Sequence, residues 1–270
     1  MTQARRAGLL KISCAILLAG LLAACGTPSS GGGAGTAPRT ASDQTDVDRR
    51  ADVRMELAAG YYSRGQYNTA LDEVKQALAL RPNMREAINL RGLIYGAMGE
   101  RQLAQESFRN ALQLFPNDPD TLHNYGWMLC QDRRFAEADA QFEAALAQAS
   151  YRAPARTFMV KGICESRAGQ MDLAEKSLAR AFEFDPASPV VATNLAEVLY
   201  RNKQYDRALF YIKRVNSQPE QVNAQSLWLA LRIQRKLKDT VVVSDLSRQL
   251  RERFADSPET QALNAERFDE

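Results

Sequence analysis

Three stretches decide the fold of this chain: GQYNTALDEVKQALALRP (65–82), GERQLAQESFRNALQLFP (99–116) and GQMDLAEKSLARAFEFDP (169–186), which superpose without gaps. The first two begin 34 residues apart, and a fourth stretch, RRFAEADAQFEAALAQAS (133–150), keeps the pattern without the final proline. Each carries apolar residues at helical spacing, and three close with a proline, which cannot continue a helix interior. A helical pattern that recurs at this period predicts stacked helix pairs, each of which buries its apolar face against its neighbours.

The same register extends over most of the chain. Small residues recur at the eighth position of each repeat and alanine at the twentieth of the first five, where two helices must approach closely. The eighth-position residues are Ala58, Gly92, Gly126, Gly162, Ala196 and Ala230. Period and pattern resemble tetratricopeptide repeats. We therefore expect an all-α, right-handed superhelical solenoid of about six repeats. The repeat domain is predicted at 47–256 (repeats 51–84, 85–118, 119–152, 155–188, 189–222 and 223–256), and a C-terminal tail at 257–270.

The first residues resemble a lipoprotein signal peptide, predicted over 1–24. Arg5 and Arg6 precede an apolar run that is too short to span a membrane, which takes about 20 residues. The run ends Leu-Ala-Ala-Cys-Gly at 22–26, which resembles the bacterial lipobox and predicts lipidation of Cys25. Gly26 after the cysteine favours the outer membrane, periplasmic face, as the location. A plain signal peptide with Cys25 incidental is the alternative. Residues 25–46 read as the lipidated cysteine and a flexible Gly/Ser/Thr/Pro linker.

Charge and motif content argue against nucleic-acid binding and catalysis. The formal net charge of +3 comes from Arg5, Arg6 and Lys11, and without them the chain has 32 basic and 32 acidic residues. A neutral mature chain is a poor partner for nucleic acid. His123 is the only histidine, and no phosphate-binding loop, dinucleotide fingerprint or zinc motif occurs. We expect no enzymatic activity, cofactor, metal site or small-molecule substrate.

A protein-binding groove is the remaining candidate site. In tetratricopeptide folds the first helix of each repeat lines the concave face, chiefly through positions 2, 5, 9, 12 and 13. Here these positions predict a largely apolar groove that includes Met55, Tyr62, Leu93, His123, Trp127, Met159 and Ile163. His123 is expected as a polar groove residue. Such a groove suits a protein segment that contributes apolar side chains. Packing between helices is the alternative role for each aromatic residue.

Cys130 and Cys164 are the thiols left once the signal peptide is removed and Cys25 is acylated. They would lie in an oxidising compartment, on the first helices of consecutive repeats. We predict a disulfide that joins the third repeat to the fourth across a two-residue insertion near Pro154. Two buried free cysteines are the alternative, because facing geometry cannot be read from a sequence.

From the lipobox to about residue 222, the chain resembles the type IV pilus biogenesis lipoproteins of the PilF/PilW family, a resemblance that implies a pilotin. The resemblance rests on the lipobox, the tether, the repeats, Asn-Tyr-Gly-Trp-Met-Leu-Cys-Gln at 124–131 and Gly-Ile-Cys at 162–164, and it covers the chain to about residue 222. It implies a membrane-anchored, non-enzymatic factor that binds the type IV pilus secretin and promotes its localisation and multimerisation. A repeat-scaffold lipoprotein that recruits other envelope proteins, such as peptidoglycan enzymes, is the alternative.

Overall fold

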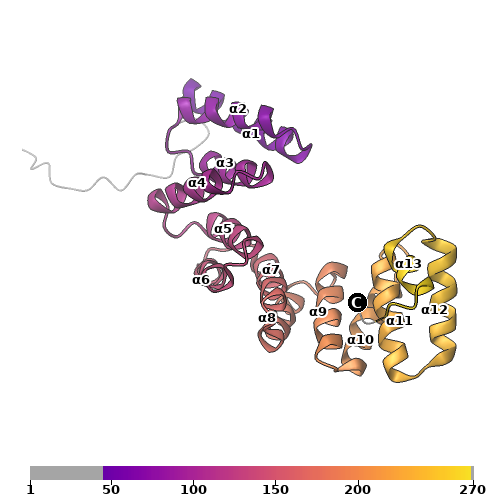
Figure 1. Ribbon diagram of the computed structural model, residues 1–270. Coiled ribbons are helices and arrows are strands. Elements are labelled where there is room, and N and C mark those ends of the chain that lie inside the picture. Colours follow the sequence, from indigo (N-terminus) through magenta and orange to yellow (C-terminus); the bar gives the residue numbers. More distant parts are fainter. Residues whose placement is uncertain (1–44, 269–270) are drawn as a thin grey trace, which may run out of the picture. The chain divides into compact units, whose positions relative to one another are not determined.

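The computed structural model describes residues 45–268, and within this range the chain is all α-helical. Six antiparallel helix pairs follow one another along the chain, and a short last helix packs against the sixth pair (Figure 1). The helices are Asp46–Ser63 (α1), Tyr67–Leu80 (α2), Arg85–Ala97 (α3), Arg101–Leu114 (α4), Pro119–Gln131 (α5), Phe135–Leu146 (α6), Pro154–Arg167 (α7), Met171–Phe184 (α8), Pro189–Arg201 (α9), Tyr205–Asn216 (α10), Ala224–Leu237 (α11), Thr240–Arg253 (α12) and Pro258–Asn264 (α13).

The two helices of a pair approach most closely at the small residues of the repeat. A Cβ atom added at Gly92 would lie 2.7 Å from the Phe108 ring, and one at Gly162 would lie 2.6 Å from Cγ of Leu178. The alanines at the twentieth position are fully buried on the opposite helix; they are Ala70, Ala104, Ala138, Ala174 and Ala208. The sequence pattern therefore marks the contact between helices within each pair.

The turn inside each pair uses a left-handed backbone residue. Gly65 has φ of 73° and Gly99 has φ of 82°, a region that glycine enters at little cost. In the third and fifth pairs Arg133 and Lys203 take the same place with φ of 60° and 61°. This repeated turn fixes the direction of the second helix and so propagates the 34-residue period.

Proline and capping residues set where the first helices begin. Pro119, Pro154 and Pro189 each lie in the first turn of a helix, where the missing N–H costs nothing. Asp118 and Ser188 cap two of these helices through side-chain acceptors.

The interfaces between pairs form the core. The largest cluster joins the last repeats, with Leu195, Leu199, Leu227, Leu231 and Ile233 among its buried members. The tail contains α13, which is capped by Ser257 and buries Leu263 against this cluster. None of the helices in the described range is long and apolar enough to cross a membrane. Signal peptide 1–24, Cys25 and most of the linker 25–46 lie outside the described residues.

Candidate functional site

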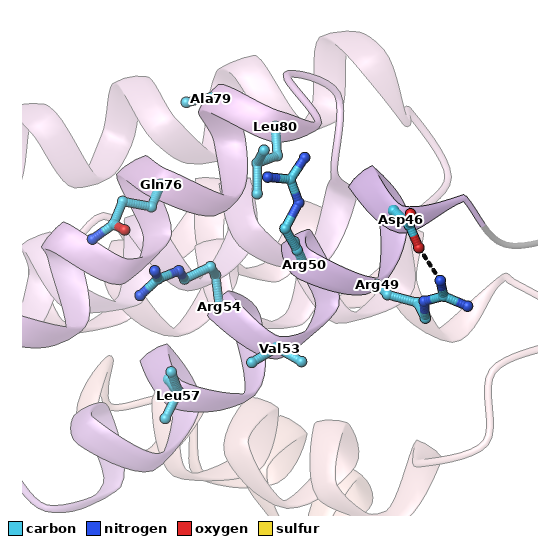
Figure 2. Close-up of a pocket in the computed structure, with 9 residues that line it drawn as sticks. All are labelled: Asp46, Arg49, Arg50, Val53, Arg54, Leu57, Gln76, Ala79 and Leu80. Carbon is cyan, nitrogen blue, oxygen red and sulfur yellow. Dashed lines mark hydrogen bonds and ion pairs between the residues drawn. The ribbon is translucent and has the colours of Figure 1, made fainter.

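A groove of about 970 Å³ lies between α1 and α2, the first helix pair. Figure 2 shows its lining, in which apolar and basic side chains alternate along α1 while α2 supplies the facing side. The lining residues are Asp46, Arg49, Arg50, Val53, Arg54, Leu57, Gln76, Ala79 and Leu80. Val53 is 54% exposed and Leu57 is 40% exposed, so apolar surface is open to a partner here.

The groove exists because the first repeat has no repeat before it in the described chain. Val53 occupies the third position of its repeat, and the third-position residues of the next four repeats are all at least 97% buried. These residues are Ala87, Thr121, Thr157 and Val191. In those repeats the preceding helix pair covers the position, whereas in the first repeat the same face is left open. The sequence reasoning missed this groove, although an apolar residue at the third position of the first repeat signals it.

The groove carries an excess of positive charge. Arg49 pairs with Asp46 (Figure 2), and Arg54 pairs with Glu73 at 2.9 Å. Arg50 has no ion-pair partner among the described residues. Apolar side chains next to arginines suit a segment that contributes apolar residues and carboxylates.

The predicted groove residues on the first helices line cavities that are more polar than expected. Met55 and Leu93 line a cavity of about 290 Å³ together with Arg85, Asp118 and Arg156. A second cavity of about 410 Å³, lined by Ile163, lies among α7, α9 and α11. Charged residues at neighbouring positions of the same helices line both cavities, so these cavities are more polar than the expected apolar groove.

The other predicted groove residues take part in packing. The Tyr62 ring lies at a tilt to the Tyr67 ring, with the ring centroids 5.8 Å apart. Burial is the main cause that raises the pKa of Tyr62, and the nearby Tyr67 contributes in the same direction. Trp127 lies under the Arg167 guanidinium, whose central carbon is 5.0 Å from the ring centroid. Met159 packs against the core cluster of the last repeats. All three are only partly buried, so each combines a packing contact with some exposed surface.

The position of His123 differs from the expectation that it is a polar groove residue. It is 2% exposed and therefore is not a groove residue. Its Nδ1 shares a 2.7 Å hydrogen bond with Thr157 Oγ1, which also lies 2.6 Å from the Tyr151 hydroxyl. Burial, with a smaller contribution from the positive charge of Arg156, lowers the pKa of His123 to about 3. A neutral imidazole held by this network fills the interface between the third and fourth repeats.

Cys130 on α5 and Cys164 on α7 are joined by a disulfide in the structure, with their Cα atoms 5.8 Å apart. Both are almost fully buried. The bond connects the first helices of two consecutive repeats, across the segment that carries the insertion. Cys25, the predicted lipidation site, lies outside the described residues.

Comparison with known proteins places the repeats in a family. The tetratricopeptide-repeat family profiles match residues 86–118 and 167–232. The type IV pilus assembly protein PilF of Pseudomonas aeruginosa is 26% identical over 220 residues, which are 82% of this chain and 87% of that protein. A solved structure described as the functional characterization of Pseudomonas aeruginosa PilF superposes with a TM-score of 0.71 over 82% of this chain and all of that chain.

The crystal structure of PilW, described as a widely conserved type IV pilus biogenesis factor, is similar along nearly its whole length. It is 32% identical to this chain, with a TM-score of 0.74 over 79% of this chain and 98% of that chain. Identity at this level over this share of both chains shows common family membership. The chain therefore belongs to the PilF/PilW family of tetratricopeptide-repeat type IV pilus biogenesis proteins.

Proposed function

We propose that this protein is a non-catalytic pilotin that binds a segment of the type IV pilus secretin in the groove between α1 and α2. The observation that carries the proposal is the open face of the first repeat, where Val53 is 54% exposed although the equivalent residues of the next four repeats are buried. Family membership supports the role in pilus biogenesis. The secretin segment and the membrane anchor are part of the proposal.

The geometry of the groove favours a helical occupant. In each of the next four repeats the first helix packs against the preceding helix pair and the equivalent residue is buried, so this face is of the kind that a helix covers elsewhere in the array. A helix-in-groove partner presents apolar anchors at a spacing of three or four residues. Val53, Leu57 and Leu80 would contact these anchors, and Arg50 would meet a carboxylate at the edge of the partner helix.

An anchor at Cys25 would serve this binding. The described residues begin about 20 residues after this cysteine, and a linker of the flexible kind that the composition predicts would span on the order of 25 Å over that length. A lipid-anchored pilotin at the periplasmic face of the outer membrane would hold bound secretin subunits close to one another and to the membrane. Their effective local concentration would rise, which promotes multimerisation without any chemical step.

Gene deletion combined with groove variants tests the proposal. Deletion is expected to abolish secretin multimers on gels, and Val53→Glu with Leu57→Glu should reproduce the loss in a folded protein, because carboxylates would replace the apolar contacts. Val241→Glu is the matched control, since Val241 is 79% exposed on α12, far along the chain from the groove.

Normal secretin multimers in the deletion strain would contradict the proposal. That result would favour the alternative hypothesis, in which the protein is a scaffold that recruits other envelope proteins, such as peptidoglycan enzymes. Loss in the deletion strain together with normal multimers in the groove variant would contradict the proposed surface alone.

A further inference from the structure

The cavity of about 410 Å³ among α7, α9 and α11 is lined by one arginine from each of these helices. Arg167 and Arg201 occupy the same position of consecutive repeats, 34 residues apart, and Arg232 lies on the next first helix. Ile163, Leu178, Val198 and Leu229 are its aliphatic lining residues. This site is separate in the chain from the groove between α1 and α2.

The arginines exceed the carboxylates that line the same cavity. Glu197 is shared, because it lies 3.0 Å from Arg201 Nε and 3.6 Å from Arg232 Nη1. Glu259 on α13 is the other acidic lining residue. Arg167 has no ion-pair partner within the described range and lies over the Trp127 ring. The cavity therefore offers guanidinium groups to a ligand that brings additional negative charge.

The chain itself shows how an aromatic segment sits at one end of this cavity. Arg232 Nε donates a 3.0 Å hydrogen bond to the backbone oxygen of Phe268, and the Phe268 ring stacks on Trp228 with centroids 5.4 Å apart. The Arg235 guanidinium lies 3.3 Å from the centroid of the same ring. Trp228 and Arg232 both line the cavity, so its rim already accepts a backbone carbonyl and an aromatic ring.

Polar amides complete the lining. Asn194 and Gln225 lie on α9 and α11, and amide side chains can pair with the backbone N–H and C=O groups of an extended segment. Carbonyl acceptance by Arg232, aromatic stacking on Trp228 and a surplus of guanidinium groups all describe the same ligand chemistry. We infer that this cavity is a second protein-binding site, which takes an extended acidic segment of a partner protein that also carries aromatic residues. The segment that holds Phe268 occupies the rim of this site and competes with the partner.

Tryptophan fluorescence gives a direct readout, because Trp228 lines this cavity and Trp127, the other tryptophan of the chain, contacts the lining residue Arg167. The probe is a short synthetic peptide of alternating phenylalanine and glutamate, titrated into the purified mature chain. A peptide of alternating phenylalanine and lysine is the control, because it has the same aromatic content and the opposite charge. We expect saturable binding of the glutamate peptide that weakens with added salt, and no saturable binding of the lysine peptide.

Arg167→Glu with Arg201→Glu should weaken binding of the glutamate peptide by roughly tenfold or more, the equivalent of about 1.4 kcal/mol. Lys176→Glu with Lys213→Glu makes the same change in net charge on α8 and α10 and should leave binding unchanged. Phe268→Ala should strengthen binding of the glutamate peptide several-fold, because it removes the ring that packs on Trp228 and Arg235. Equal binding of the two peptides, unchanged binding by the Arg167/Arg201 variant, or no binding by either the wild type or Phe268→Ala would overturn the inference. Thermal melts of each variant confirm that it is folded.

Discussion

Replacing Gly162 with alanine tests the close approach on which the helix pairs depend. A Cβ atom at this position would lie 2.6 Å from Cγ of Leu178, 3.1 Å from the backbone oxygen of Ala174 and 3.2 Å from the backbone nitrogen of Leu178. Two of these atoms belong to the backbone, so α7 and α8 must separate to admit the methyl group. Overpacking of this kind costs about 1–3 kcal/mol, and alanine regains about 1 kcal/mol of helix propensity. We expect the upper part of the range because backbone must move, which leaves a net loss of about 1–2 kcal/mol.

Gly60→Ala is the matched control for this prediction. A Cβ atom at Gly60, inside α1, would touch only the end of the Arg64 side chain at 3.7 Å, an ordinary contact. This variant should therefore gain up to about 1 kcal/mol from helix propensity alone. Urea denaturation followed by circular dichroism measures both variants against the wild type. Gly162→Ala as stable as Gly60→Ala would refute the reasoning, because the two sites would then differ in no way that affects packing.

Three further predictions concern Cys25, the Cys130–Cys164 pair and His123. Intact mass of the native protein should show acylated Cys25 as the first residue, and an unmodified Ser or Thr start downstream would contradict this. Denatured, unreduced protein should show no reactive thiol at Cys130 and Cys164, and reduction should lower stability by about 3–4 kcal/mol in the chain-entropy model, whereas two free thiols would refute the pairing. Since the folded pKa of His123 is about 3, below that of an unfolded histidine, its contribution to stability should be lost as pH falls from about 6.5 toward 3, at up to about 1.4 kcal/mol per pH unit. His123→Gln should flatten this slope, and a His123 NMR signal that titrates near pH 6.5 in the folded protein would contradict it.

The helix pairs could be predicted from the sequence because their determinants are local and repeated. Close contact requires a small residue on each helix, and the period places Gly92 opposite Phe108 in the same way as Gly162 opposite Leu178. Repetition makes this pattern visible where a single helix pair would show nothing distinctive. The family resemblance followed from the same register together with the residues around Trp127.

The binding surfaces could be predicted only in part, because register does not determine what lies beside a residue. Met55, His123 and Met159 share the fifth position of their repeats, but only His123 is fully buried. Thr157 of the fourth repeat shares a hydrogen bond with the imidazole, and Tyr151, in the loop before α7, shares one with Thr157, so this network depends in part on the path of a loop.

The groove between α1 and α2 could not be predicted from the register of its residues. Val53 has the register of a buried interface residue, and it is exposed because of where its repeat stands in the array. The groove positions of the repeat lie on its concave face, whereas Val53 lies on the face that packs against a preceding repeat in the rest of the array. The candidate groove therefore lies at the uncovered end of the first helix pair and not on the concave face.

Direct binding of the purified secretin to the purified mature protein tests the central claim most directly. We expect the wild type and Val241→Glu to bind with equal affinity, because Val241 lies on α12, outside the groove. Val53→Glu with Leu57→Glu should bind roughly tenfold or more weakly, since apolar anchors of this kind typically contribute at least about 1 kcal/mol each. Wild-type affinity in the folded double variant would contradict the account.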